Sequence, residues 1–392
     1  MAHLGEVARL FLRLGFTAFG GPAAHIALME DEVVNRRKWI DRQQFLDLVA
    51  AVNFIPGPNS TELAIHLGML RAGWKGLIVA GVCFIAPAML IILPIGWLYV
   101  HYGQLPQVAG PLMGIRACMI AIIAAAMWRF AKTGIKDRFT AAIAMGAVVA
   151  GFVMMLPRFR APQAELIILA GAAFLGAMRY GGWRGENRIP LAAIPTTFAA
   201  SAAALGVSAK FVHLGLFFLK VGATLFGSGY VLVSYLRGGL VDEKQWLTGQ
   251  QLTDAVAVGQ FTPGPLLTTA TFIGYILGQQ WAGQRGAIAG GMIATAAIFF
   301  PSFCLVAILG PLWNRFRGSR RIRGALDGMN AAVVALILVV SIALGKEAIN
   351  GIAAGVVAGV CLVLILKWNV NSTWLILGAG VAGWALHRGG LG

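Results

Sequence analysis

Long apolar runs separated by short polar islands dominate the pattern of this chain. A helix that crosses the hydrocarbon core of a bilayer needs about 20 apolar residues, and these runs reach or approach that length. We therefore predict an all-α, polytopic membrane protein in contact with the lipid bilayer. The predicted spans cover residues 77–99, 108–128, 139–156, 164–178, 287–309, 325–344, 352–366 and 373–386.

The composition agrees with this pattern, because 58% of the residues are hydrophobic and only 12% are charged. A soluble domain carries about a quarter of its residues as charged side chains. The formal net charge is +16, but the lysines and arginines lie mainly at the ends of spans, where a positive-inside bias accounts for most of them. We expect no nucleic-acid partner, and we predict a multi-pass protein of the cytoplasmic (inner) membrane.

One sequence pattern occurs twice. Residues 11–21 read FLRLGFTAFGG and residues 218–228 read FLKVGATLFGS, an offset of 207 residues (218 − 11). After a small insertion the offset becomes 214 (301 − 87). We predict an N-terminal repeat over residues 1–185, an Ala-rich linker over 186–208 and a C-terminal repeat over 209–392. The matched positions include Trp39 and Trp246, Asp47 and Asp254, Pro56-Gly57-Pro58 and Pro263-Gly264-Pro265, Pro87 and Pro301, and Gly114 and Gly328.

The loop charges indicate that the two repeats are inverted. Between the third and fourth apolar elements the first half reads HYGQ (101–104), whereas the second half carries five arginines between residues 315 and 323, and one loop later the bias reverses. Positive charge marks the cytoplasmic side, so matching loops lie on opposite faces. Inversion needs an odd number of crossings between repeats. Either the broken elements enter and leave on one face and residues 190–206 cross, or the first element spans and 190–206 lie on the surface.

Two kinds of helix break recur, one in each half. Gly20-Gly21-Pro22 matches Gly227-Ser228-Gly229, and the other break is the repeated Pro-Gly-Pro. Proline removes a backbone donor and clashes with the preceding turn, so residues 45–55 and 59–70 are predicted as half-helices that meet at the first Pro-Gly-Pro. Such irregular backbone at membrane depth is buried in protein or lines a cavity. The half-helix that starts at Asn59-Ser60-Thr61 would point free N–H groups at an anion; a packing kink without a ligand is the alternative.

Polar and charged side chains near the breaks are candidate ligands. Arg13 and Lys220 match, and a cation in an apolar stretch is costly, unless it reaches the interface along its aliphatic stem. Arg116 is either a second anion ligand or the partner of an acid such as Glu62. The other candidates for substrate binding are Thr17, Thr224, Gly20, Gly21, Gly227, Asn53, Gln260, Pro56, Gly57, Pro58, Asn59, Ser60, Thr61, Pro263, Gly264, Pro265 and Thr268.

Three acids are candidate proton carriers, namely Asp47, Asp254 and Glu62. Asp47 and Asp254 also stand near the start of their elements, where a carboxylate complements a helix N-terminus. His25 and His66 have no counterpart at the 207 offset. We interpret both histidines as packed side chains.

The sequence carries no motif for catalysis, a cofactor or a metal: there is no GxGxxG after a strand, no GxxxxGK[ST], no HExxH and no cysteine cluster. We therefore predict a transporter rather than an enzyme, with no cofactor or metal site. Two other classes stay open. An intramembrane enzyme acting on a phosphate-bearing lipid would need a nucleophile or metal cluster, and a structural membrane protein would have no reason to place Arg13 and Lys220 at matching depth.

Four segments resemble the chromate ion transporter family in its long, two-domain form. FGGPAAH (19–25), NRRKWIDRQQFLD (35–47) and FIPGPNSTELAIHLG (54–68) resemble its N-terminal signature, and FTPGPLLTTATFIGY (261–275) resembles its C-terminal block. The resemblance implies a secondary transporter that exports chromate and confers chromate resistance. Membrane potential and proton antiport both remain open as driving forces, as do sulfate or another oxyanion as substrate, and a monomer or a homodimer as the assembly.

Overall fold

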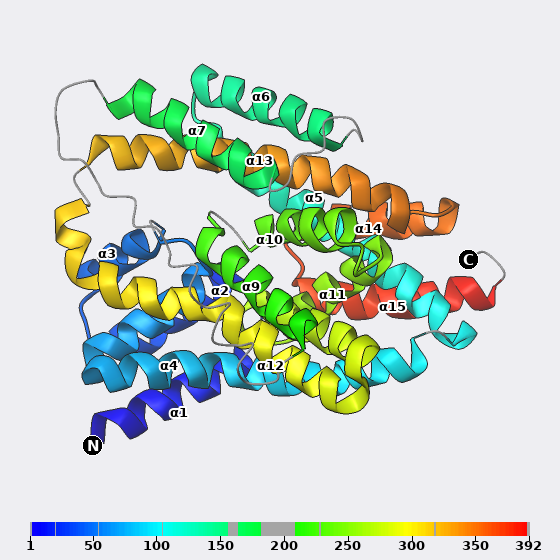
Figure 1. Ribbon diagram of the computed structural model, residues 1–392, viewed down its shortest axis with the longest axis horizontal. Coiled ribbons are helices and arrows are strands. Elements are labelled where there is room, and N and C mark those ends of the chain that lie inside the picture. The colour runs from blue at the N-terminus through cyan, green and yellow to red at the C-terminus, as the bar shows by residue number, and fades with distance from the viewer. Residues whose placement is uncertain are drawn as a thin grey trace.

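The computed structural model describes residues 2–19, 21–53, 55–103, 105–155, 164–181, 208–226, 229–316 and 319–389. These residues form helices and connecting turns, without a strand in any of these ranges. Nearly all of the predicted linker 186–208, together with Gly20, Gly227 and Ser228, lies outside them. Figure 1 shows the long helices running broadly along the longest axis of the molecule.

The two halves contain corresponding elements in the same order, as the repeat predicts, and the second half has in addition a short 3-10 helix, η4. The first half consists of α1 (Ala2–Thr17), α2 (Pro22–Glu30), the π-helical η1 (Asp31–Arg36), α3 (Arg42–Val52), α4 (Asn59–Tyr102), α5 (Pro106–Gly134), α6 (Arg138–Met155) and α7 (Ala164–Gly181). The second half consists of α9 (Ala209–Thr224), α10 (Val231–Leu236), η3 (Arg237–Glu243), α11 (Gly249–Phe261), η4 (Leu266–Thr268), α12 (Thr269–Phe316), α13 (Arg320–Ala348), α14 (Ile352–Trp368) and α15 (Ser372–Arg388).

Local details repeat at the same offset. Helix α3 begins with a capping box formed by Asp41 and Gln44, and α11 begins with one formed by Thr248 and Gln251. Such a box satisfies two backbone donors that the first turn leaves open. Long matching stretches of sequence therefore specify the same local structure twice.

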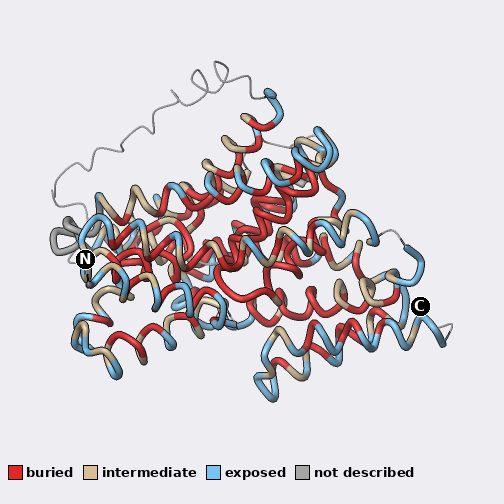
Figure 2. Tube along the Cα trace, turned by 90° about the horizontal axis from the view of Figure 1, so that it is seen from below, coloured by how far each residue is buried: buried red, intermediate tan, exposed pale blue. Residues whose placement is uncertain are grey.

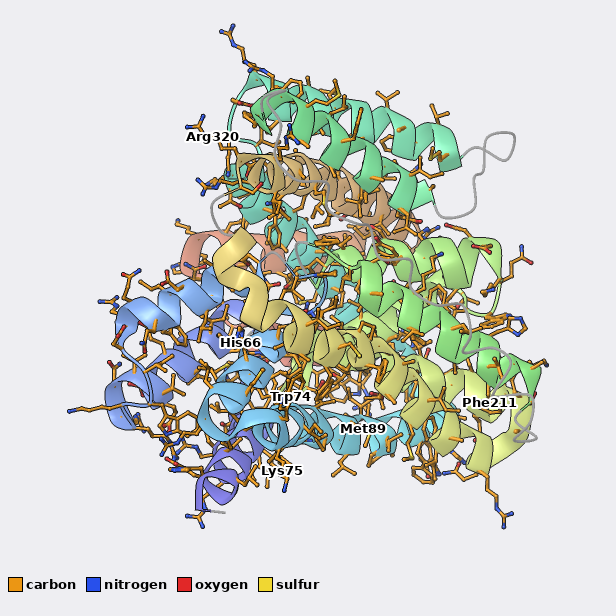
Figure 3. All side chains as sticks on the ribbon, turned by 60° about the vertical axis from the view of Figure 1, so that its left-hand side comes forward. His66, Trp74, Lys75, Met89, Phe211 and Arg320 are labelled. Carbon is orange, nitrogen blue, oxygen red and sulfur yellow. The ribbon has the colours of Figure 1, made fainter. Side chains whose placement is uncertain are left out.

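Helices α4 and α12 each turn back on themselves shortly after the Pro-Gly-Pro loop. The turns fall at Gly73 and Gly283, both with φ of 62°, a conformation that glycine adopts at little cost. Close packing follows each turn, with Gly68 against the backbone of Gly76 and Gly274 against that of Gly290. Small residues let two helical segments approach closely in this way. In Figure 3, His66 lies before the α4 turn, and Trp74 and Lys75 lie after it.

Corresponding helices of the two halves run antiparallel. Along α4 and α12, Gly81 lies against Phe303 while Leu93 lies against Gly291, so residue numbers rise on one helix as they fall on the other. The same holds for α5 and α13, where Gly134 lies against Asn330 and Ile120 against Gly345. A two-fold axis perpendicular to these helices relates the halves, and this is the predicted inverted repeat.

Four helical segments within the described ranges are long and apolar enough to cross a membrane: Asn59–Tyr102, Pro106–Gly134, Leu266–Ile308 and Arg320–Ala348. Figure 2 shows buried residues on the inner faces of the helices and exposed residues on the outer faces. Many exposed side chains are large and apolar, such as Trp374 and Val381 of α15. This outer surface is suited to contact with lipid, as in a polytopic membrane protein.

The packing of the helices defines two bodies, and each body contains helices from both halves. The loop-bearing body contains α1–α4, α9, α11 and α12, joined where α4 packs on α12, while α10 packs on α13 of the other body. The flanking body contains α5–α7 and α13–α15. Within the flanking body, α7 packs on α13 and α15 packs on α5, so the last helix of each half lies against the other half. The two repeats are therefore intertwined.

Candidate functional site

The two Pro-Gly-Pro loops contact the opposite half through reciprocal backbone hydrogen bonds. The N–H of Gly57 donates to the carbonyl of Leu225 at 2.7 Å, and the N–H of Gly264 donates to the carbonyl of Ala18 at 2.9 Å. Ala18 and Leu225 are themselves a matched pair at the offset of 207. Gly57 and Gly264 have positive φ angles of 142° and 92°, a conformation that favours glycine. Each Pro-Gly-Pro loop therefore binds the chain just before the Gly-rich break of the other repeat.

His25 links these two kinds of break in the first half. Its side chain is 1% exposed, with Nε2 3.0 Å from the carbonyl oxygen of Ala18 and Nδ1 3.3 Å from Ser60 Oγ. A carbonyl accepts only, so Nε2 carries the proton, and in the neutral ring Nδ1 accepts from the Ser60 hydroxyl. His25 is thus a packed, hydrogen-bonded side chain, as the sequence analysis interpreted it, although its partners could not be predicted because they lie on other elements.

Four buried polar atoms close to the Pro-Gly-Pro loops in the sequence have no hydrogen-bond partner among the described residues. They are Thr61 Oγ1, Glu62 Oε2, His66 Nδ1 and Gln260 Nε2. Buried polar groups are normally paired, so such atoms mark a place for a ligand or for water. Thr61 and Glu62 belong to the first turn of α4, whose N-terminus also favours negative charge.

Other predicted neutral donors are engaged with the backbone. Thr17 donates to the carbonyl of Arg13 and Thr224 to that of Lys220, both at 2.8 Å. Thr268 donates to the carbonyl of Pro265, and Asn53 donates to that of Val49 while accepting from Asn59. Of the predicted side-chain donors, Thr61 and Gln260 thus have a donor atom without a partner in the described part of the chain.

Glu62 is fully buried beside the first Pro-Gly-Pro loop. Ser302 of α12 donates to its Oε1 at 3.4 Å, and no ion pair involves its carboxyl group within the described ranges. Ser302 comes from the other half and was not predicted from the sequence. At the matched position of the second loop, Gly264 lies against Ala88 rather than against a hydroxyl group. The two loops therefore differ chemically, although each makes the same backbone hydrogen bond to the opposite half.

Arg116 pairs with an acid, which is one of the two roles proposed for it from the sequence, but the acid is Asp254 rather than Glu62. Two parallel hydrogen bonds of 2.7 Å join the guanidinium group to the carboxylate. Tyr99 also donates to Asp254 at 2.7 Å, and Arg116 reaches Gln250 at 3.4 Å. Asp254 is 2% exposed. This bidentate pair connects α5 of the flanking body to α11 of the loop-bearing body.

Arg13 forms an ion pair with Glu32 of η1. Burial alone raises the pKa of Glu32, but hydrogen bonds from Arg13 and Arg37 outweigh this effect and hold its pKa below the ordinary value. Arg13 thus ties α1 to η1 in this conformation. Its role as an anion ligand stays a prediction.

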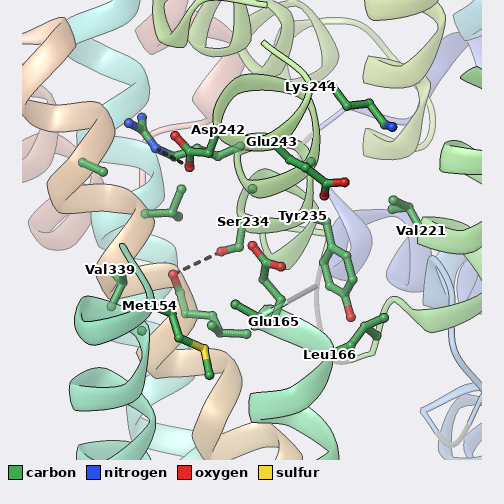
Figure 4. Close-up of a pocket in the computed structure, with 18 of the residues that line it drawn as sticks. Met154, Glu165, Leu166, Val221, Ser234, Tyr235, Asp242, Glu243, Lys244 and Val339 are labelled. Carbon is green, nitrogen blue, oxygen red and sulfur yellow. Dashed lines mark hydrogen bonds and ion pairs between the residues drawn. The ribbon is translucent and has the colours of Figure 1, made fainter. Parts of the chain in front are cut away.

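Lys220 lines a cavity of about 1040 Å³ between α6, α7, α9, α10, η3 and α13. Figure 4 shows carboxylates on its walls, among them Glu165, Asp242 and Glu243. Four lysines and arginines and four carboxylates line this cavity, so its charges balance. Among the described residues that line it, the cavity shows neither broken helices nor contact between the two repeats' loops, and we place the candidate site at the Pro-Gly-Pro loops instead.

The remaining predicted acid, Asp47, accepts a hydrogen bond of 3.4 Å from Gln43 on the same helix. Within the described ranges, no group of three or more His, Cys, Asp or Glu residues is arranged to hold a metal ion. The candidate site is therefore built from the N-terminal end of α4, neutral side-chain donors and one buried carboxyl group.

Comparison with known proteins matches both halves to one family model. The model described as "Chromate transporter" matches residues 5–177 and again residues 212–384. A chromate transport protein of Cupriavidus metallidurans is 31% identical over 97% of this chain and 92% of its own length. A probable chromate transport protein of Synechococcus elongatus is 29% identical over 94% of this chain and 91% of its own. An uncharacterised transporter of Bacillus subtilis is 29% identical over 44% of this chain and 92% of its own. No solved structure matches.

Proposed function

Because the chain belongs to the chromate transporter family, we propose that it exports chromate across the cytoplasmic membrane and so confers chromate resistance. The reciprocal contact of the two Pro-Gly-Pro loops carries this proposal. It brings irregular backbone from both inverted repeats together, which is where inverted-repeat transporters bind their substrates. The family placement favours transport over an intramembrane enzyme.

The site binds a tetrahedral dianion mainly through neutral donors. The N-terminus of α4, the Thr61 hydroxyl and the Gln260 amide supply hydrogen bonds, while Arg13 and Arg116 are already paired with acids. Hydrogen bonds to a charged ligand stabilise it by about 1.5–3 kcal/mol each. A carrier must also release its substrate, so a site without an unpaired cation suits transport better than tight binding.

Membrane potential favours the export of this substrate. Moving one charge through 100 mV is worth about 2.3 kcal/mol, so a dianion gains about 4.6 kcal/mol on leaving a negative-inside cell. Proton antiport would add a second driving force. Glu62 is then the proton carrier, because it is buried beside the site without a cation, whereas Asp254 is held by Arg116. A buried carboxyl group without a countercharge is far less costly in its neutral form.

Uptake of labelled chromate by inside-out vesicles tests this proposal. We expect uptake that increases when the vesicle interior is made positive and that excess sulfate inhibits weakly. A Glu62→Gln variant should keep potential-driven uptake but lose the response to an imposed pH gradient. Folded protein without chromate uptake would contradict the proposal. Strong inhibition by sulfate, together with sulfate uptake, would assign the carrier to sulfate instead.

A further inference from the structure

Helices α3 and α11 correspond in the repeat but are packed very differently. Helix α11 packs against α5, α13 and α15 of the flanking body. Helix α3 has its extensive contacts with α2, α4 and α12, all of the loop-bearing body. Perfect two-fold symmetry would instead place α3 against α13, α5 and α7. The conformation is therefore asymmetric, with the loop-bearing body closed onto the flanking body at α11 and not at α3.

The exposure of matched residues locates this difference on one helix face. Leu46 is 48% exposed, whereas its counterpart Thr253 is 1% exposed. Ala50 and Asn53 are exposed, while their counterparts Ala257 and Gln260 are buried. These positions lie three or four residues apart and so share a face of the helix. This face of the helix is buried in α11 and open in α3, from residue 46 to residue 53.

On the closed side, an ion pair between Arg116 and Asp254 holds the two bodies together. Their bidentate pair joins the two bodies, and Tyr99 and Gln250 hydrogen bond to its members. This pair must break if α11 is to separate from α5. The repeat offsets identify the counterpart of each partner, because Asp254 corresponds to Asp47 and Arg116 corresponds to Asn330.

We propose that Arg116 and Asp254 form a gate that closes one face of the carrier, and that Asp47 and Asn330 form the gate of the opposite face. In the second state α3 packs on α13, in the way that α11 packs on α5 in the present structure. The ion pair between Arg116 and Asp254 is then broken. This inference rests on the proposed transport function and adds the residues that control access to its site. Arg116 is then a positioning residue of the gate rather than a ligand of the substrate.

The two gates differ in strength. In the Arg116–Asp254 pair both partners carry charge and two parallel hydrogen bonds join them, whereas the opposite gate offers only a neutral asparagine amide to its aspartate. The resting protein therefore favours the state with the Arg116 gate closed. Removing Arg116 should shift the population toward the second state, and placing an arginine at residue 330 should do the same by strengthening the other gate.

The test measures maleimide labelling of single cysteines in the full-length purified protein, with its four native cysteines replaced. With Arg116 present, a cysteine at residue 46 (Leu46→Cys) should react about tenfold faster than one at residue 253 (Thr253→Cys), in line with their exposure. Arg116→Asn should slow the first reaction and speed the second. Asn330→Arg should change both rates in the same directions. Lys136→Gln is the matched control, because it breaks another ion pair, Lys136–Asp327, that joins the two halves within the flanking body.

Opposite changes at the two cysteines support the gates, whereas unfolding would speed both reactions. If Arg116→Asn speeds the labelling of both cysteines, the variant has been destabilised. Asn330→Arg, which removes no existing ion pair, then decides whether the gates exist. Unchanged rates in Asn330→Arg, or the same changes in Lys136→Gln, would overturn the proposal. The labelling uses no chromate, so the gates can be tested even if the flux experiment shows no chromate transport.

Discussion

Unpaired polar atoms on Thr61 and Gln260 make these two residues the most informative single positions in the candidate site. Both side chains are buried, and each presents a hydrogen-bonding atom without a partner in the described part of the chain. Leaving a buried polar group unpaired costs about 1–3 kcal/mol. A protein tolerates this cost where a ligand or water completes the hydrogen bonds for part of its cycle.

Replacing either residue by an apolar residue of similar size should weaken chromate binding without loss of stability. We expect Thr61→Val and Gln260→Leu each to raise the KM for chromate roughly tenfold. Each variant loses one hydrogen bond to a charged ligand, which is worth about 1.5 kcal/mol of binding free energy. Vesicle flux at varied chromate concentration measures this change. Thr262→Val is the control, since the Thr262 hydroxyl donates to the carbonyl of Val258 in its own helix. An unchanged KM in both variants would remove these donors from the site.

The sequence predicted only part of this residue-level picture. Thr61, Gln260, Arg116 and Asp254 were found because they are polar or charged residues near repeated breaks or within apolar runs. The partners Ser302 and Tyr99 were missed, because they come from elements about 240 and 155 residues away in the chain. Tertiary packing decides such pairings, and spacing along one helix does not contain them.

At the scale of elements, the first Pro-Gly-Pro loop requires glycine at its centre. Gly57 has a φ of 142°, and a β-carbon there would lie 2.6 Å from Ser302 Oγ and even closer to the Glu62 carboxyl group. The half-helices on both sides, α3 and the first segment of α4, agree with the breaks that proline predicts. The turns at Gly73 and Gly283 fall just before the predicted spans that start at residues 77 and 287, but the sequence did not predict that each helix turns back on itself there.

We therefore expect Gly57→Ala to lower stability by about 1–3 kcal/mol, the cost of a residue held in an unfavourable backbone conformation. Chromate transport should be lost, because the loop would move away from Leu225 and Glu62. Thermal unfolding in detergent and vesicle flux provide the two readouts. Gly146→Ala in α6 is a matched control, since its β-carbon would point into open space. Full transport with unchanged unfolding would show that the loop geometry is not needed.

At the scale of the whole molecule, inverted symmetry organises both the site and its access. Repeats of one sequence build antiparallel helices, and their last helices cross to pack on the other half. The sequence predicted this inversion from loop charges alone. It did not predict the intertwining or the asymmetric packing of α3 and α11, because near-identical local patterns carry no information on which of two related conformations the chain adopts.

The location of bound chromate tests the central claim most directly, because chromium scatters anomalously at its absorption edge. Crystals of the full-length protein grown with chromate should show one strong anomalous peak within hydrogen-bonding distance of Thr61 and Gln260, between the two Pro-Gly-Pro loops. A strong peak in the cavity beside Lys220, with none at the loops, would contradict the account and move the binding site to the charged cavity.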